Sequence, residues 1–149
     1  FQLKRDNPEH KKSLADDLMN MKTGIFGYKG RVHYQAAECM NDFIAALPTD
    51  MSKNDFFATV ATEIDRRIYS NYHLYPGNYV AIDLLQGGET HANRYTTEER
   101  ATFEHYLAGQ LQKIDIPGKD ETFLRTKLLE MYANPALNQL KVMGEGING

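Results

Sequence analysis

The chain lacks the features by which several large classes of protein are recognised. It has no tryptophan and a single cysteine, Cys39, so it contains no internal disulfide. The absence of a disulfide framework favours a cytosolic environment. No apolar run approaches the roughly 18 residues that a transmembrane helix needs, and no secretory signal peptide is visible. We therefore expect a cytoplasmic protein without a membrane-spanning helix.

A strong excess of charge is also missing. The 17 Lys and Arg residues against 20 Asp and Glu residues give a formal net charge of −3. This charge is too small and too acidic for a nucleic-acid-binding surface over the whole chain, so no nucleic-acid partner is expected. Only residues 4–12 are locally basic. A solvated helix surface explains this stretch, and contact with an anionic membrane is the sharper alternative.

The composition that remains is that of an ordinary globular protein. The chain has 149 residues, of which 42% are hydrophobic and 25% charged, which fits one domain with a buried core. We place a single domain at residues 1–135, because Asn134 precedes Pro135 and a residue before proline avoids the helical region. Residues 136–149, which are glycine-rich from Gly144 onwards, are expected to form a flexible tail.

Helical patterns dominate this domain. Thr96 and Glu99 form a capping box, and Gly87 suits the end of the preceding helix. Residues 79–85 fit either a helix or a buried strand, and helix is the preferred interpretation. The expected helices span residues 7–23, 43–47, 52–72, 79–85, 96–114 and 123–134.

The helix expected at 52–72 carries the strongest amphipathic pattern. Its apolar residues lie four apart in one stripe, made of Phe56, Val60, Ile64 and Ile68. We expect this stripe to pack in the core, because a domain of this size needs such stripes internally. If the chain is a piece of a larger protein, part of the stripe faces the rest of that protein instead.

One strand is predicted, at about residues 29–36. Val32 and Tyr34 share one face, and Arg31, His33 and Gln35 share the other, as in an edge or half-covered strand. No second strand is evident, and even a two-stranded hairpin is marginal in water. The strand therefore pairs either with a weak strand elsewhere in this chain or with a sheet outside it. The predicted fold class is α+β, predominantly helical with one short strand region.

No catalytic, cofactor-binding or metal-binding constellation is found in the sequence. Residues 144–149 spell G-x-G-x-x-G, but a dinucleotide site needs a strand before this motif and a helix after it. His33 and Glu38 lie five apart, so they would point to opposite faces of a strand. The five histidines show no i, i+4 pairing with one another. We therefore assign no catalytic, cofactor-binding or metal-ligating residue.

One aromatic cluster surrounds Pro76. Tyr72, Tyr75 and Tyr79 lie three and four residues apart in this part of the chain. Packing is the simpler interpretation of such a cluster. The sharper interpretation is that these tyrosines line a cleft for a lipid or another ligand, and they are the candidate cleft-lining residues.

Four stretches of the chain together resemble a known family. They are Lys29–Tyr34, Glu63–Asp65 with Asn71 and Tyr72 following, Tyr75–Leu85, and Met131–Pro135. In this order and rough spacing the chain resembles the C-terminal portion of bacterial lysophospholipid acyltransferases, the 1-acylglycerol-3-phosphate acyltransferase group. The resemblance spans most of residues 22–135. The motifs that carry the family's chemistry, an H-x4-D, a phosphate-contacting arginine motif and an F-P-E-G-T-type block, have no match here.

The resemblance implies a non-catalytic role for this chain. In the family, an acyl group passes from acyl-CoA or acyl-carrier protein to a lysolipid, with the histidine as general base and the aspartate orienting it. The chain begins with Phe1, not Met, so we expect a piece of a longer protein of α/β fold, with the strand at 29–36 joining a sheet built upstream. The implied partners are the upstream catalytic part, a second copy of this piece, and the inner face of the membrane, which the parent contacts peripherally. No cofactor is expected in this chain itself.

A stand-alone helical interaction module without enzymatic activity is the alternative. It would fold as a soluble monomer, with the strand at 29–36 paired internally or bent into a loop. The acyltransferase interpretation instead predicts exposed apolar surface, and hence dimers or strand exchange.

Overall fold

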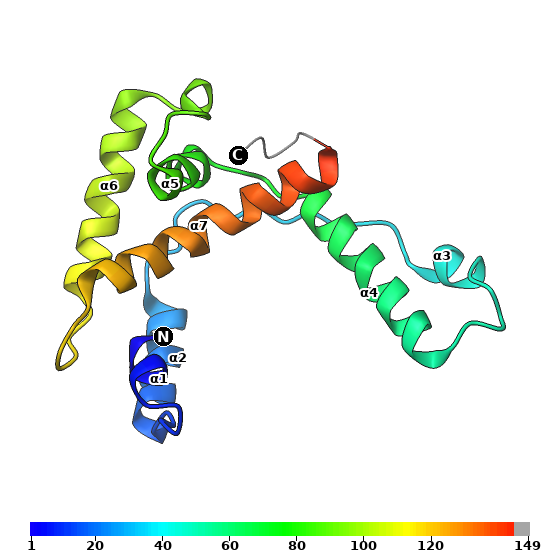
Figure 1. Cartoon of the computed structure of the whole chain (residues 1–149), viewed down its shortest axis with the longest axis horizontal. Helices are drawn as coiled ribbons and strands as arrows, with labels where there is room; N and C mark the ends of the chain where they lie inside the picture. Colours follow the sequence, from blue (N-terminus) through cyan, green and yellow to red (C-terminus); the bar gives the residue numbers. More distant parts are fainter. Residues whose placement is uncertain (145–149) are drawn as a thin grey trace.

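The computed structural model describes residues 1–144, and these form helices joined by loops (Figure 1). No strand is present within this described range, so the predominantly helical character is confirmed. The elements in chain order are α1 (Gln2–Asp6), α2 (Leu14–Phe26), α3 (Asn41–Ala45), α4 (Lys53–Ser70), α5 (Pro76–Gln86), the short 3-10 helix η1 (Ala92–Arg94), α6 (Thr97–Gln112) and α7 (Glu121–Met143).

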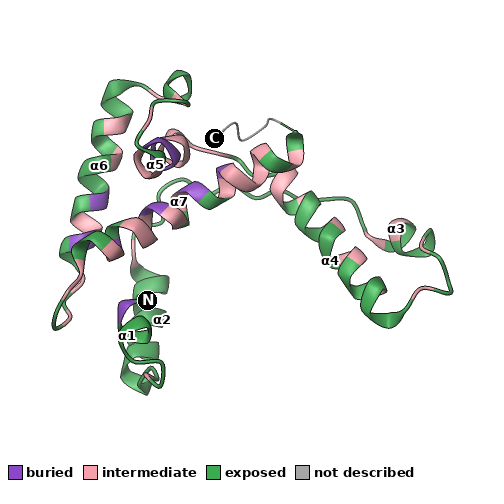
Figure 2. Ribbon diagram, in the orientation of Figure 1, coloured by how far each residue is buried: buried purple, intermediate pink, exposed green. Residues whose placement is uncertain are grey.

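The buried core lies where α5, α6 and α7 pack together. Ile82 of α5, Leu107 of α6 and Leu129 of α7 are almost fully buried there. Ala133 and Ala136 present small side chains to the same core, which lets the α5 and α7 backbones approach closely. Figure 2 shows that nearly all buried residues belong to these three helices.

Helix α7 continues through Pro135, so the last helix does not end at Asn134 as predicted. Proline lacks the N–H that would bond to the carbonyl of Met131 and disturbs that turn. In the same turn, Asn78 Nδ2 donates to the Tyr132 carbonyl at 2.7 Å. At the start of α5, Asn78 Oδ1 accepts from the Tyr75 N–H at 2.8 Å. Packing against α5 therefore supports the helix where local propensity would end it.

Residues 136–143, which were predicted to belong to a flexible tail, are helical. Gly144 ends α7 in the left-handed conformation, with φ of 72°, a conformation that favours glycine. The rest of the tail and of the G-x-G-x-x-G motif, residues 145–149, lies outside the described residues.

Helices α3 and α4 form an arm that extends away from the core (Figure 1). The C-terminal end of α4 meets α7, where the Gln139 side-chain amide donates to the carbonyls of Tyr69 at 3.1 Å and Tyr72 at 3.0 Å. These bonds join the end of α4 and the residues that follow it to α7. No residue of α4 is buried, so the expected core role of its apolar stripe is wrong for this chain by itself.

The N-terminal helices begin and end at different residues from those predicted. Asn7 ends α1 instead of starting a helix, and α2 begins after Ser13. The Ser13 hydroxyl accepts from the Asp16 N–H at 3.2 Å, and the Asp16 carboxylate accepts from the Ser13 N–H at 2.8 Å. This complete capping box outweighs the Asn-Pro pair as a start signal, and Gly24 is accommodated inside α2.

Helix α1 is held against the loop between α6 and α7 by one buried side chain. The Gln2 amide nitrogen donates to the Gly118 carbonyl at 2.8 Å, and its oxygen accepts from the Asp120 N–H at 2.8 Å. Arg5 adds a hydrogen bond of 2.7 Å to the Asp120 carboxylate. The N-terminal end of the chain is thereby attached to the core.

The strand predicted at 29–36 does not form in this chain. The segment follows a path without strand hydrogen bonds, and none of its backbone groups bonds to another backbone group of residues 1–144. Val32 and Tyr34 are exposed, Tyr34 to 90%. A strand needs a second strand to satisfy its N–H and C=O groups, and the elements around this segment are helices.

Candidate functional site

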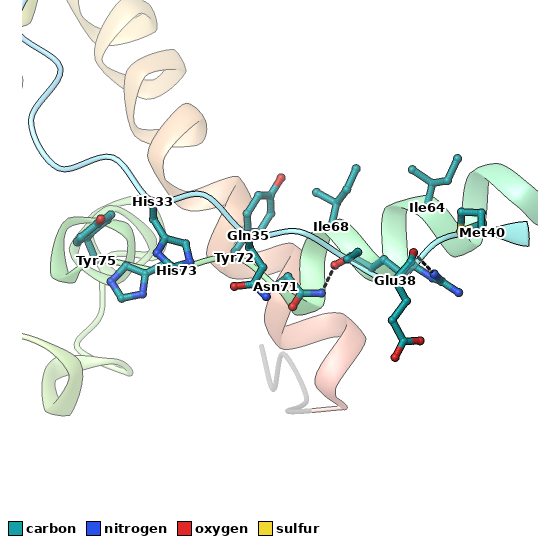
Figure 3. Close-up of a pocket in the computed structure, with 12 residues that line it drawn as sticks. His33, Gln35, Glu38, Met40, Ile64, Ile68, Asn71, Tyr72, His73 and Tyr75 are labelled. Carbon is teal, nitrogen blue, oxygen red and sulfur yellow. Dashed lines mark hydrogen bonds between the residues drawn. The ribbon is translucent and has the colours of Figure 1, made fainter. Parts of the chain in front are cut away.

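A groove of about 440 Å³ lies between the extended segment, which is the connection 27–40 between α2 and α3, and the C-terminal half of α4 (Figure 3). The loop that joins α4 to α5 closes it on a third side. Its lining residues are His33, Gln35, Ala37, Glu38, Met40, Ile64, Arg67, Ile68, Asn71, Tyr72, His73 and Tyr75.

Arg67 fixes the extended segment to α4. Its Nη1 donates to the Glu38 carbonyl at 2.7 Å, and its Nε donates to Glu63 Oε1 at 2.7 Å. The side chains of Arg67 and Glu63 are mostly shielded from solvent, so the pair is screened less than a surface ion pair. One wall of the groove is thus held in place without a strand.

Glu63 is the acceptor for two arginines. Arg66 donates to both carboxylate oxygens, at 2.6 and 2.7 Å. Hydrogen bonds from Arg66 in the first place, and from Arg67, lower the pKa of Glu63 to about 2. The carboxylate is therefore ionised at neutral pH and serves to orient Arg67, and it is unsuited to act as a proton acceptor there.

Three rings form the other end of the groove. The His33 and His73 rings stack with centroids 4.8 Å apart, and the Tyr75 ring meets His73 edge-on at 4.8 Å. Figure 3 shows His33 arriving from the extended segment while His73 and Tyr75 come from the loop before α5. This group of three rings was not predicted from the sequence, because His33 and His73 are far apart in the chain.

The three candidate tyrosines divide between two places. Tyr72 and Tyr75 line the groove. Tyr79 lies within α5, where its ring contacts His91 at 5.8 Å between centroids and lies 5.5 Å from the Arg94 guanidinium carbon. The structure therefore brings together two of the three side chains that the sequence grouped around Pro76.

The groove combines an apolar side with a polar end. Ile64, Ile68 and Met40 give apolar walls, while His33 and His73 offer ring nitrogens. An amphipathic ligand, with an aliphatic part along α4 and a polar part near the two histidines, fits such a lining. No set of three His, Cys, Asp or Glu side chains within residues 1–144 is placed to hold a metal ion.

One buried carboxylate outside the groove has a structural role. Asp83 of α5 is 1% exposed and accepts from the Tyr95 hydroxyl at 2.6 Å and from the His91 N–H at 3.1 Å. Burial, together with the hydrogen bond to Asp83, raises the pKa of Tyr95. Because these donors satisfy the carboxylate, Asp83 holds the loop between α5 and α6 against the core.

Comparisons with protein-family models, with curated proteins and with solved structures give no match. None of the helices in the described range is both long and apolar enough to cross a membrane.

Proposed function

We propose that this chain is the non-catalytic C-terminal structural region of a glycerolipid acyltransferase. The complete enzyme would transfer an acyl group from acyl-CoA or acyl-carrier protein to a lysolipid. The observation that carries the proposal is the segment 29–36, which is held beside the helices with its backbone unpaired. Such a segment can join a sheet supplied by the catalytic part, and it contains the Lys29–Tyr34 stretch on which the family resemblance depends.

The positions of the resembling stretches support the same proposal. His33, the Asn71–Tyr72 pair and Tyr75 belong to three of them and all line the groove. Glu63, in the second stretch, orients Arg67 at the groove wall. Residues far apart in the sequence thus converge on one place, and we propose that the groove forms part of the surface that receives the lysolipid.

The test is an acyl-transfer assay on two proteins. One is the 149-residue chain, and the other is the product of the complete reading frame that encodes it. With labelled acyl-CoA and 1-acylglycerol-3-phosphate, we expect transfer by the complete protein and none by the chain. Transfer by the chain alone, or no transfer by the complete protein with lysolipid acceptors and either acyl donor, would contradict the proposal.

A pair of variants tests the role of the groove in the complete protein. Ile68→Asp places a charge in the apolar wall and should raise KM for the lysolipid about tenfold, since one buried apolar contact is worth roughly that factor in binding. Phe57→Asp lies on the same helix outside the groove and should leave KM unchanged. Equal KM values for both variants would exclude the groove from lysolipid binding.

The stand-alone interaction module remains the second candidate, and one observation favours it. Helices α5, α6 and α7 close a core on their own, with Ile82 and Leu129 each 1% exposed. A chain of this kind would unfold cooperatively as a monomer, and its reading frame would show no acyl transfer. The assay above therefore separates the two candidates.

A further inference from the structure

Helix α2 carries a regular apolar stripe with no partner in the described structure. The stripe consists of Leu14, Leu18, Met21 and Ile25, which are between 59% and 78% exposed, and α2 has no buried residue. In Figure 1 the helix projects from the side of the molecule opposite α5 and α6. The helix is capped and has 13 residues. An exposed apolar stripe of this kind is expected to bind another surface.

The spacing of the stripe fits a second helix as the covering surface. The intervals are four, three and four residues, which is the alternation of d and a positions in a coiled coil. Leu18 and Ile25 then occupy a positions, and Leu14 and Met21 occupy d positions. Such a seam packs against another helix of the same pattern, knob into hole.

The charges beside the seam identify the partner helix. In this register Asp17 occupies a g position and Lys22 the e position five residues later. Across a parallel coiled coil, a g residue faces the e residue of the next heptad on the other helix. Two copies of α2 in parallel would therefore place Asp17 of each copy against Lys22 of the other. In an antiparallel pair, Asp17 would meet Gly24 and no charge pair would form.

We propose that α2 is a self-association surface, which pairs in parallel and in register with α2 of a second copy of this chain. Asp17 and Lys22 make no ion pair within residues 1–144, so both charges are free to pair across the interface. The other candidate surface is an anionic membrane, and the charges disfavour it. Asp16 and Asp17 flank the stripe on its polar side, where a membrane-binding helix carries Lys or Arg.

Sedimentation of the 149-residue chain over a range of concentrations tests the pairing. We expect a monomer–dimer equilibrium that Leu18→Asp abolishes, while circular dichroism shows an unchanged helical signal, because Leu18 is exposed in the monomer. Asp17→Lys and Lys22→Glu should each raise the dimer Kd about fivefold or more by placing like charges together. The double variant restores the opposite-charge pairs and should return close to the original Kd. Asn20→Lys, on the far side of α2, is the matched control and should have no effect.

Cross-linking tests the direction of the pair. In a Cys39→Ser background, Leu18→Cys places two thiols at facing a positions of a parallel pair, within reach of a disulfide. Asn20→Cys places them on the outer faces. We expect a covalent dimer from the first variant and none from the second.

Three results would overturn the proposal. The first is a monomer at every concentration up to the millimolar range, and the second is a dimer that Leu18→Asp and the charge changes leave intact. The third is a monomeric chain that sediments with phosphatidylglycerol vesicles and loses this binding in Leu18→Asp, which would assign the stripe to a lipid surface. None of these results depends on acyl transfer, so the proposal fails or stands separately from the proposed function.

Discussion

Helices α2 and α4 carry the clearest apolar stripes of the described helices, yet the buried apolar residues belong to α5, α6 and α7. Ile82, Leu107 and Leu129 are enclosed by one another in the core. Leu18 of α2 and Phe57 of α4 are exposed to solvent. Periodicity therefore predicts that a helix face will be covered, and it does not identify what covers it.

The core and the α4 arm are also stabilised by different kinds of interaction. In the core, hydrophobic burial holds the helices, and each large side chain removed from water stabilises the fold by about 1.5–3 kcal/mol. In the α4 arm, local capping, the Glu63–Arg67 pair and the bonds from Gln139 hold the chain. These contacts are individually weak, so the two regions should respond very differently to mutation.

The largest expected effect is a cavity in the core. Leu129→Ala should lower the free energy of unfolding by about 2–5 kcal/mol, because the space that it leaves is enclosed on all sides. Met131→Ala, on the same helix but at an exposed position, should cost less than about 1 kcal/mol. Urea unfolding followed by circular dichroism measures both values. Equal losses would mean that α7 does not have one buried and one exposed face.

The second-largest loss of stability is expected from removal of the buried Asp83 carboxylate. Asp83→Ala removes the acceptor for the Tyr95 hydroxyl and the His91 N–H, and should lower the free energy of unfolding by about 1.5–3 kcal/mol. Asp65→Ala removes an exposed carboxylate and serves as the control in the same unfolding experiment. If both variants unfold at the same urea concentration, Asp83 does not hold the loop between α5 and α6.

A smaller loss of stability is expected when low pH protonates Glu63 in the α4 arm. The folded pKa of Glu63, about 2, lies below the value of about 4.3 for an unfolded chain. The resulting stabilisation is thus complete above that unfolded value and is lost as the pH falls through the folded pKa. The carboxyl carbon shift of Glu63, followed by NMR against pH, should give a midpoint near 2. Arg66→Gln should raise this midpoint, and a midpoint near 4.3 in the unaltered chain would contradict the arginine contacts.

The smallest effect is expected at Phe57, an exposed apolar residue beside the stripe of α4. Phe57→Ser should change the free energy of unfolding of the chain by less than about 0.5 kcal/mol, since more than half of the residue is exposed. The same substitution should also be made in the complete protein, so that its effect on stability can be compared with that in the isolated chain. A loss of stability there, and none in the isolated chain, would show that the rest of the protein covers this face.

Much of the helical fold could be predicted from local signals. The capping box of Thr96 and Glu99 begins α6 close to where it was expected, and Gly87 ends α5 in the left-handed conformation. The misses have physical reasons that lie outside the local sequence. Pro135 remains inside α7 because Asn78, far away in the chain, bonds to the disturbed turn.

The candidate site was predictable only in part for the same reason. Tyr72 and Tyr75 are close in sequence, and a cluster of aromatics signalled them. The stacked His33 and His73 depend on the path of the extended segment, which Arg67 fixes through a backbone carbonyl. A contact between a side chain and a distant carbonyl leaves no pattern in the sequence. The segment 29–36 alternates like a strand, but its pairing depends on a partner that alternation cannot supply.

Hydrogen exchange of residues 29–36, measured in the 149-residue chain and again in the complete protein, tests the proposed role most directly. We expect fast exchange in the isolated chain, where the backbone N–H groups have no partners. In the complete protein, exchange of alternate residues should slow strongly as the segment becomes an edge strand of the sheet, while α5–α7 remain protected in both. Equally fast exchange of this segment in both proteins would contradict the account, because the segment would then have no sheet to join.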